Sequence, residues 1–169
     1  MSKLTVEALL DRAAITDTVY RYATGIDTRD WALYRSIFAD EVDFDFHTWS
    51  GAPPSRIKAD DWVAGVRGGL SGFDATQHTL TNPVVTLNGD EATCVMYMSA
   101  LHYLVTGEKR EMQSLGGYYT DKLRRTGDGW KIHACTLTVT WTMGDRGLFT
   151  IARERWDARQ AKAQPQGVS

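Results

Sequence analysis

The sequence predicts an α+β fold in which N-terminal helices pack on one face of a curved antiparallel sheet and close a cone-shaped pocket. Apolar residues recur with a helical period near the N-terminus, and four long strand-like segments follow one another from residue 75. The turn sequences "NGDE", "TGEK" and "TGDG" separate these segments and suit hairpins. Helices followed by such a meander are typical of α+β domains.

The first part of the chain predicts three helices and one strand. In residues 5–26 apolar or small residues recur close to a 3.6 period, and Thr5 is suited to cap the helix. A second helix is expected over 29–38. The segment "EVDFDFHTW" alternates apolar and polar residues, which is typical of a strand, whereas two prolines make "GAPPSR" a loop. A short helix that includes Trp62 is expected over 59–67.

Long strands are predicted for most of the remaining chain. They cover residues 75–87, 92–106, 111–125 and 129–142. A last helix is expected in "LFTIARERWDAR", and "QAKAQPQGVS" should be a frayed end. We therefore expect one domain over residues 1–160 and a flexible tail over 161–169.

Composition limits the possible partners and cofactors. The chain has 169 residues and a net charge of −2, which gives no basic field for nucleic acid or an anionic membrane. No apolar run approaches the ~20 residues that span a membrane, and the N-terminus does not resemble a secretory signal, so a cytoplasmic protein is expected. Cys94 and Cys135 lack the spacing of a zinc or CxxC site and should be buried free thiols.

A carboxylate at the end of the first helix and a histidine about fifty residues later are the main candidates for chemistry. Asp27 extends an apolar row of the helix, where a carboxylate is costly unless it is partnered. His78, in "DATQHTLTNPVV", could partner it and act as a general base. Strict alternation places Leu80 and Val84 on the side of His78. Two plainer interpretations stay open: Asp27 could cap the second helix together with Asp30, and His78 could be a hydrogen-bonded core residue.

His102 is a second histidine expected to face the interior. It shares a strand face with Met96, Met98, Ala100 and Leu104. Asp27, His78 and His102 are three potential metal ligands, but no HxH or HExxH spacing supports such a site, so no metal or other cofactor is expected. No GxSxG elbow indicates a serine nucleophile. His47 and His133 lack a comparable pattern of partners.

Four segments resemble, in their order and spacing, the SnoaL-like branch of the nuclear transport factor 2-like superfamily. They are "YATGIDTRDW", "VDFDF", "TQHTLTNPVV" and "TGDGWKI". Within that branch the chain is similar to scytalone dehydratase, bile acid 7α-dehydratase and hexachlorocyclohexane dehydrochlorinase. The resemblance covers about residues 5–145 and implies a cystatin-like cone with Asp27 and His78 as a catalytic dyad. It also implies that Tyr22 and His102 match active-site residues.

The same resemblance implies which residues bind substrate. Phe46 and Tyr119 stand where scytalone dehydratase carries a tyrosine and an amide. Val139 lies near the position of an arginine in the bile acid enzyme. Trp62 and Met98 complete the expected substrate-binding set.

Residues and resemblance together predict a cofactor-independent lyase or isomerase for a small, apolar, cyclic substrate such as a polyketide or steroid. In this hypothesis Asp27 orients His78, which removes a proton from carbon, while Tyr22 or His102 assists a leaving group. The alternative is a non-catalytic module that binds a small ligand or assembles with partners, as the small subunit of a ring-hydroxylating dioxygenase does. Epoxide hydrolysis is a third possibility, but it needs a second carboxylate in the pocket.

The long strands are apolar on both faces, which predicts a homo-oligomer. The second apolar set on the predicted strand 92–106 is Val95, Tyr97, Leu101, Tyr103 and Val105. One pocket cannot bury both faces, so the outer face should pack on another copy. The resemblance to the dehydratases favours a trimer over a dimer.

Overall fold

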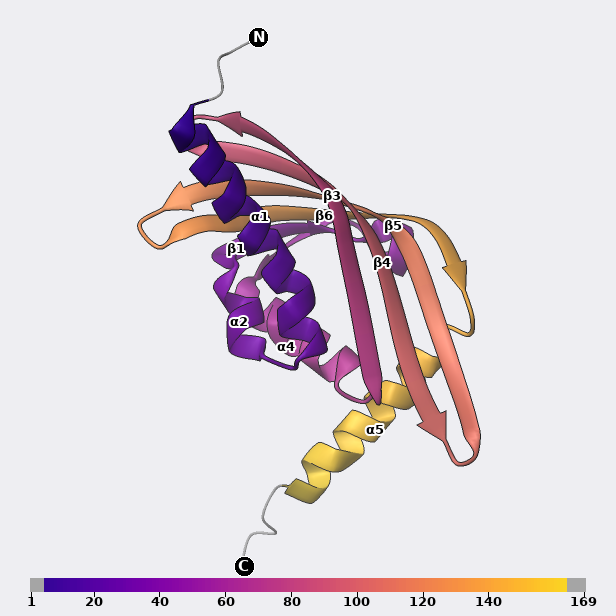
Figure 1. The fold of residues 1–169 in the computed structure, drawn as a ribbon. Helices are drawn as coiled ribbons and strands as arrows, with labels where there is room; N and C mark the ends of the chain where they lie inside the picture. The colour runs from indigo at the N-terminus through magenta and orange to yellow at the C-terminus, as the bar shows by residue number, and fades with distance from the viewer. Residues whose placement is uncertain (1–4, 164–169) are drawn as a thin grey trace, which may run out of the picture.

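The computed structural model describes residues 5–163, which form helices followed by one curved sheet (Figure 1). The helices are α1 (Val6–Asp27), α2 (Trp31–Ser36), α3 (His47–Ser50), α4 (Ala59–Leu70) and α5 (Leu148–Ala163). The strands are β1 (Phe38–Asp45), β2 (Ser55–Lys58), β3 (Ala75–Asn88), β4 (Glu91–Thr106), β5 (Lys109–Thr126) and β6 (Gly129–Met143).

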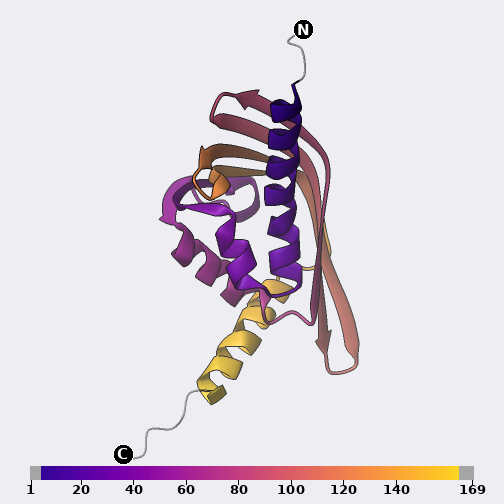
Figure 2. The same cartoon turned by 60° about the vertical axis from the view of Figure 1, so that its left-hand side comes forward.

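The strands form a single sheet in the order β2-β1-β6-β5-β4-β3. Strands β3 to β6 are an antiparallel meander, whereas β1 pairs parallel with β6 and antiparallel with β2. Helices α1, α2 and α4 lie on one face of this sheet (Figure 2). The predicted α+β fold, with helices on one face of a curved antiparallel sheet, is therefore confirmed.

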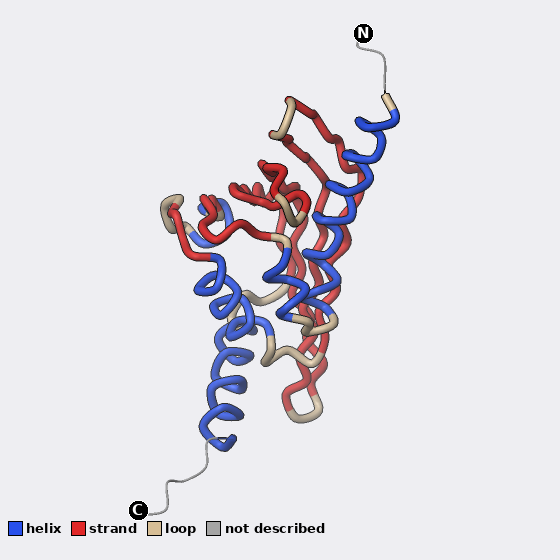
Figure 3. Tube along the Cα trace, turned by 90° about the vertical axis from the view of Figure 1, so that its left-hand side faces the viewer, coloured by secondary structure: helices blue, strands red, loops and turns tan. Residues whose placement is uncertain are grey.

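Helix α1 lies along the sheet because its apolar side chains follow the helical period. The Thr5 side chain caps it by accepting a hydrogen bond from the backbone N–H of Ala8 over 3.2 Å. The buried apolar stripe comprises Ile15, Val19, Tyr22 and Ile26. The helix runs beside the edge strand β3 (Figure 3) and ends at Asp27. Neither α1 nor any other helix within residues 5–163 is long and apolar enough to cross a membrane.

The region around α2 differs from the prediction. Helix α2 starts after Asp30, whose side chain accepts a hydrogen bond from the backbone N–H of Leu33 over 2.9 Å. Asp30 rather than Asp27 therefore caps this helix, which leaves the Asp27 carboxylate available to other partners. Strand β1 already begins at Phe38, inside the helix predicted over 29–38.

Three further elements depart from the prediction. The four-residue helix α3 occupies the end of "EVDFDFHTW", which was predicted to be a strand, and the four-residue strand β2 begins inside the predicted loop "GAPPSR". Each of these elements is too short to show a period. Strand β2 begins directly after Pro54, as an edge strand permits. Helix α5 continues to Ala163, three residues past the predicted domain end at 160, and the rest of the predicted tail lies outside the described residues.

An extra residue in β3 changes which of its side chains face the helices. The register between β3 and β4 shifts by one between Thr81 and Val84. Asn82 lies in this bulge with a φ of 55°, in the left-handed region. The bulge makes the predicted place of Val84 wrong: Val84 is 65% exposed, and Val85, at 6%, points into the core instead.

The bulge also brings the two interior histidines to the same face. With it, His78 pairs with Ala100, and Thr76 pairs with His102. Directly opposed residues point to the same side of a sheet. If the register of the β3–β4 turn continued unbroken, His78 would pair with Leu101 and point outward. The position of His78 in the interior therefore depends on one inserted residue.

The inner face of the sheet carries the core. The predicted interior set on β4 is buried, namely Met96, Met98, Ala100, His102 and Leu104. Cys94 and Cys135 are buried free thiols, as predicted. Asp121 is paired with Cys94 on one side and Cys135 on the other, and burial raises its pKa to about 7. Its Oδ1 has no hydrogen-bond partner within the described residues.

Replacing Asn82 by valine should destabilise the fold, because a β-branched side chain is strained at a positive φ. The free energy of unfolding, measured by urea denaturation, should be about 1–2 kcal/mol lower for Asn82→Val than for Asn82→Gly. Glycine is the control because it adopts this backbone conformation without steric cost. Equal stability of the two variants would contradict the bulge.

Candidate active site

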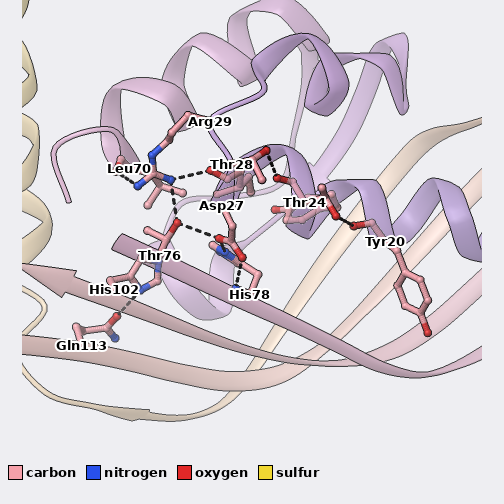
Figure 4. A network of polar contacts seen from close by, with 12 residues as sticks. Tyr20, Thr24, Asp27, Thr28, Arg29, Leu70, Thr76, His78, His102 and Gln113 are labelled. Atoms are coloured by element: carbon pink, nitrogen blue, oxygen red, sulfur yellow. Dashed lines mark hydrogen bonds and ion pairs between the residues drawn. The ribbon is translucent and has the colours of Figure 1, made fainter. Parts of the chain in front are cut away.

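Asp27 and His78 are in direct contact where α1 ends against β3 (Figure 4). The Nδ1 atom of His78 lies 2.7 Å from Oδ1 of Asp27. The backbone N–H of His78 donates to Oδ2 of the same carboxylate over 2.6 Å. The His78 side chain is only 6% exposed. The two residues that the sequence singled out therefore meet, and both oxygens of Asp27 are committed to His78.

Thr76 and Arg29 support the carboxylate from a second direction. The Thr76 hydroxyl donates to Oδ1 of Asp27 over 2.9 Å, and Nη1 of Arg29 donates to that hydroxyl over 2.8 Å. Because a guanidinium can only donate, the single hydrogen of Thr76 must point at Asp27. Arg29 also donates to the backbone carbonyls of Ile26 and Leu70, over 2.7 and 3.1 Å, which hold it in place.

These contacts keep Asp27 ionised. Burial acts to raise the pKa of Asp27, but the hydrogen bonds from His78 and Thr76 outweigh burial and hold the pKa below its ordinary value. An ionised carboxylate only accepts hydrogen bonds, so Nδ1 of His78 carries the hydrogen between them. The other nitrogen, Nε2, then keeps its lone pair in the uncharged ring and can take up a proton.

His78 lines a pocket of about 200 Å³ between the sheet and the helices. Four lining side chains are polar, namely Tyr22, His78, His102 and Tyr119. The other side chains are apolar: Ile26, Phe46, Trp49, Trp62, Val66, Leu70, Met98, Ala100, Leu115, Leu137 and Phe149. An apolar wall with a few convergent polar groups is typical of a small-molecule site.

Tyrosine hydroxyls gather on one side of this pocket. The Tyr119 hydroxyl donates to the Tyr22 hydroxyl over 3.1 Å. The Nε1 atom of Trp62 donates to Tyr34 over 2.9 Å, and the rings of Tyr34 and Tyr22 meet edge to face at 5.0 Å. Burial raises the pKa of Tyr22 and of Tyr119 well above the ordinary value. Tyr22 therefore keeps its proton at neutral pH and can donate it to a bound molecule.

His102 lies beside His78 on the neighbouring strand. The two imidazole rings are nearly perpendicular, with centroids 5.7 Å apart. Nδ1 of His102 contacts Oε1 of Gln113 at 3.1 Å, and the Phe73 and Phe149 rings pack nearby. Burial, and next the charge of His78, lower the pKa of His102 to about 4. His102 is therefore uncharged at neutral pH.

Seven of the predicted site residues line the pocket together, namely Tyr22, Phe46, Trp62, His78, Met98, His102 and Tyr119. Asp27 lies behind His78. Val139 does not line this pocket, although its side chain packs against the core. The backbone N–H of Val139 donates to the Thr48 hydroxyl of α3 over 3.0 Å, and Leu137 lines the pocket instead.

The remaining histidines lie outside this site. His47 contacts Asp45 at 2.9 Å, and His133 contacts Glu91 at 3.1 Å. Within residues 5–163 no three side chains of His, Cys, Asp or Glu are grouped so that they could hold a metal ion. The polar side chains that line the pocket, two tyrosines and two histidines, can transfer protons and form hydrogen bonds.

Three supporting residues were not predicted from the sequence. The position of Gln113 could have been predicted from the sequence, because counting along the hairpin from the "TGEK" turn pairs it with His102. The position of Thr76 could also have been predicted, since Thr76 precedes His78 by two residues and shares its strand face. The position of Arg29 could not have been predicted, because it depends on a backbone φ of 61°, which no residue pattern indicates.

The comparison with known proteins agrees with this architecture. Residues 7–136 match the SnoaL-like domain. The chain belongs to the SnoaL-like family. It is 30% identical over 148 residues to the terrestric acid biosynthesis cluster protein E of Penicillium crustosum, which covers 84% of this chain and 91% of that protein.

Solved structures of other proteins show the same fold. The Kfla4162 protein from Kribbella flavida is 31% identical, with a TM-score of 0.78 over 86% of this chain and 99% of that one. A putative scytalone dehydratase from Novosphingobium aromaticivorans is 20% identical, with a TM-score of 0.69 over 82% of this chain and 89% of that one. The family inferred from the four sequence segments is thus confirmed.

Replacing Thr76 by valine removes one of the donors to Asp27 and should lower the free energy of unfolding at pH 7 by about 1.5–3 kcal/mol. Thr79→Val is the matched control, because Thr79 is exposed and pairs with Ser99 on the opposite face. Chemical denaturation of the three proteins measures the difference.

The effect of Thr76→Val should depend on pH in one direction. Because the folded-state pKa of Asp27 lies below its ordinary value, the stabilisation is complete above the unfolded pKa of about 4. It is lost as the pH falls through the lower, folded-state pKa. The difference between wild type and variant should therefore shrink in acid. A difference that stays constant from pH 7 to pH 2 would show that Thr76 does not act on the ionised carboxylate.

Proposed function

We propose that the protein is a cofactor-independent lyase or isomerase for a small, apolar, cyclic substrate, with Asp27 and His78 as its general base. One observation carries this proposal. An imidazole held through Nδ1 by an ionised carboxylate lines an apolar pocket, and its Nε2 has no hydrogen-bond partner within residues 5–163. A base positioned in this way supports proton removal from carbon, because the carboxylate stabilises the imidazolium that forms.

The proposed elimination uses two groups of the chain. Nε2 of His78 removes a proton from a carbon next to an electron-withdrawing group, and the electrons of that C–H bond form the new double bond. The bond from the neighbouring carbon to its hydroxyl group breaks. Tyr22 protonates the departing oxygen, so water leaves, and the imidazolium proton of His78 then restores the Tyr22 phenol. In an isomerisation the imidazolium returns the proton to a different carbon of the substrate.

Relatives in the SnoaL-like family support a role in small-molecule chemistry. The Penicillium crustosum relative belongs to a biosynthesis cluster by name. The putative scytalone dehydratase and a hexachlorocyclohexane dehydrochlorinase share the fold. Their names describe elimination of water and of hydrogen chloride. Both reactions begin with proton removal from a carbon, the step that we assign to His78.

The test of the proposal is a screen of hydroxylated and halogenated cyclic ketones. Loss of water or halide, or exchange of a carbon-bound hydrogen for solvent deuterium, is the expected result. The alternative is a non-catalytic binding module with the same pocket. That alternative requires compounds that raise the melting temperature but undergo neither elimination nor deuterium exchange.

His78→Ala and Asp27→Asn should each keep the fold but lower kcat on a substrate found in the screen by about 10²–10⁴. The loss follows from removing the base in one case and the group that orients it in the other. Circular dichroism checks the fold. His47→Ala is the control, because His47 lies outside the pocket, and it should keep the wild-type rate. If a protein that carries both His78→Ala and Asp27→Asn retained the native rate, Asp27 and His78 would be excluded as the base.

We also propose that the outer face of the sheet joins copies of the chain. Tyr97 is 59% exposed and Trp141 48% exposed. They share a face, because Trp141 pairs with Gly116, which in turn pairs with Ser99 two residues from Tyr97. The indole lies so close to Gly116 that a Cβ there would meet it at 2.3 Å. Exposed aromatic rings on one face of a sheet are suited to covering by a second copy.

Light scattering coupled to size exclusion should give a trimer, as the resemblance to the dehydratases implies. The double substitution Tyr97→Lys with Trp141→Lys should produce monomers, because two cations would be buried without partners. Leu9→Lys, on an exposed position of α1, is the control and should leave the mass unchanged. An oligomer that survives the double substitution would place the interface elsewhere.

A further inference from the structure

We infer that His102 acts as a hydrogen-bond acceptor that selects substrates carrying a hydroxyl group, and that it does not donate the proton to the leaving group. The inference rests on the proposed function only in taking the pocket as the substrate site. It follows from the hydrogen bonds behind the ring, which fix its tautomer, and from the chemistry of the pocket in front of it.

The orientation of the Gln113 amide determines which nitrogen of His102 carries hydrogen. Gln113 is fully buried, and its Nε2 donates to the backbone carbonyl of Ser114 over 2.9 Å. A carbonyl can only accept, so the amide cannot be reversed without losing this bond. Its oxygen Oε1 therefore faces Nδ1 of His102 at 3.1 Å. Since that oxygen also only accepts, Nδ1 of His102 must hold the hydrogen.

The other ring nitrogen of His102 is then a lone pair. A second proton on the ring is disfavoured, because burial and the neighbouring His78 lower its pKa to about 4. Nε2 of His102 has no hydrogen-bond partner within residues 5–163. In that part of the chain, Oδ1 of Asp121 is the only side-chain atom that is both fully buried and without a hydrogen-bond partner. Nε2 of His102 therefore retains accessible surface, and the pocket that the ring lines provides it.

The pocket thus presents two acceptor nitrogens to a bound molecule. Nε2 of His78 is backed by a carboxylate and can become charged, whereas Nε2 of His102 is backed by a neutral amide and stays an acceptor. A hydroxyl group on the substrate satisfies His102, and a ketone or ether oxygen at that point does not, because two acceptors then face each other. A buried acceptor left unpaired strongly disfavours the wrong ligand.

The remaining lining residues define the body of that substrate. None of the residues that line the pocket is Lys, Arg, Asp or Glu. A carboxylate, phosphate or ammonium on the ligand would be buried without a countercharge. Aromatic rings form much of the wall, including Phe46, Trp49, Trp62 and Phe149. The substrate class is therefore an uncharged, ring-containing alcohol or phenol, with its hydroxyl at His102 and its acidic C–H bond at His78.

The tautomer can be measured without any ligand. Long-range ¹H–¹⁵N correlation spectra of the labelled wild-type protein at pH 7 should show His102 with a protonated Nδ1 and an unprotonated Nε2. In Gln113→Leu the acceptor behind Nδ1 is gone, so the hydrogen should move to Nε2. A protonated Nε2 in the wild type, or an unchanged tautomer in Gln113→Leu, would overturn the inference.

Selection is tested with two probes of the same shape, 2-naphthol and 2-methoxynaphthalene, by isothermal titration. The wild type should bind 2-naphthol at least about tenfold more tightly, since the ether leaves the acceptor unpaired. His102→Phe should reduce that ratio to about one, and His47→Phe, the control outside the pocket, should keep it. Equal wild-type affinities, binding of neither probe, or an unchanged ratio in His102→Phe would each contradict the inference.

These measurements separate this inference from the proposed enzyme. A protein with the expected tautomer and the expected preference, but without turnover of any ketone, would retain His102 as a selecting acceptor and lose the general base. Turnover in a protein whose His102 is protonated at Nε2 would support the general base and contradict the role of His102 as an acceptor.

Discussion

The carboxylate of Asp27 is the contact on which the site depends. It ends α1 and accepts hydrogen bonds from the backbone and ring of His78 and from Thr76. A carboxylate on the apolar side of a helix costs free energy unless donors replace the water that it loses. These donors all belong to strand β3, so satisfying the charge also fixes the distance between helix and sheet. The orientation of His78 is a consequence of how α1 docks.

The two interior histidines share a strand face but differ in what stands behind them. A carboxylate behind His78 stabilises the positive charge that proton uptake creates. An amide behind His102 offers no such charge, and burial keeps that ring neutral. Two imidazoles about 6 Å apart can therefore have different roles, because groups outside the pocket decide their protonation. In the proposed elimination, Tyr22, which burial keeps protonated, is left as the donor.

Much of this arrangement could be predicted from local sequence patterns. The helical period led to Asp27 at the end of α1, and strand alternation placed His102 inside. Strict alternation failed in β3, where it placed Val84 in the interior, because the bulge at Asn82 inserts one residue. The four-residue helix α3 was not predicted either, because so short a helix has no period that a sequence could reveal. Local patterns indicate faces, whereas inserted residues and short covering segments depend on tertiary contacts.

The choice among reactions follows from what the pocket contains, since one fold serves many chemistries. Hydrolysis of an epoxide requires a water held between a base and a second acid. The two acids near the end of β1, Asp43 and Asp45, do not line the pocket and contact Arg56 and His47 instead. The polar groups that line the pocket include the imidazole of His78 with a carboxylate behind it, the protonated phenol of Tyr22 and the neutral imidazole of His102. That set matches removal of a proton from carbon with assistance to a departing oxygen, because each group then has the protonation state that its step requires.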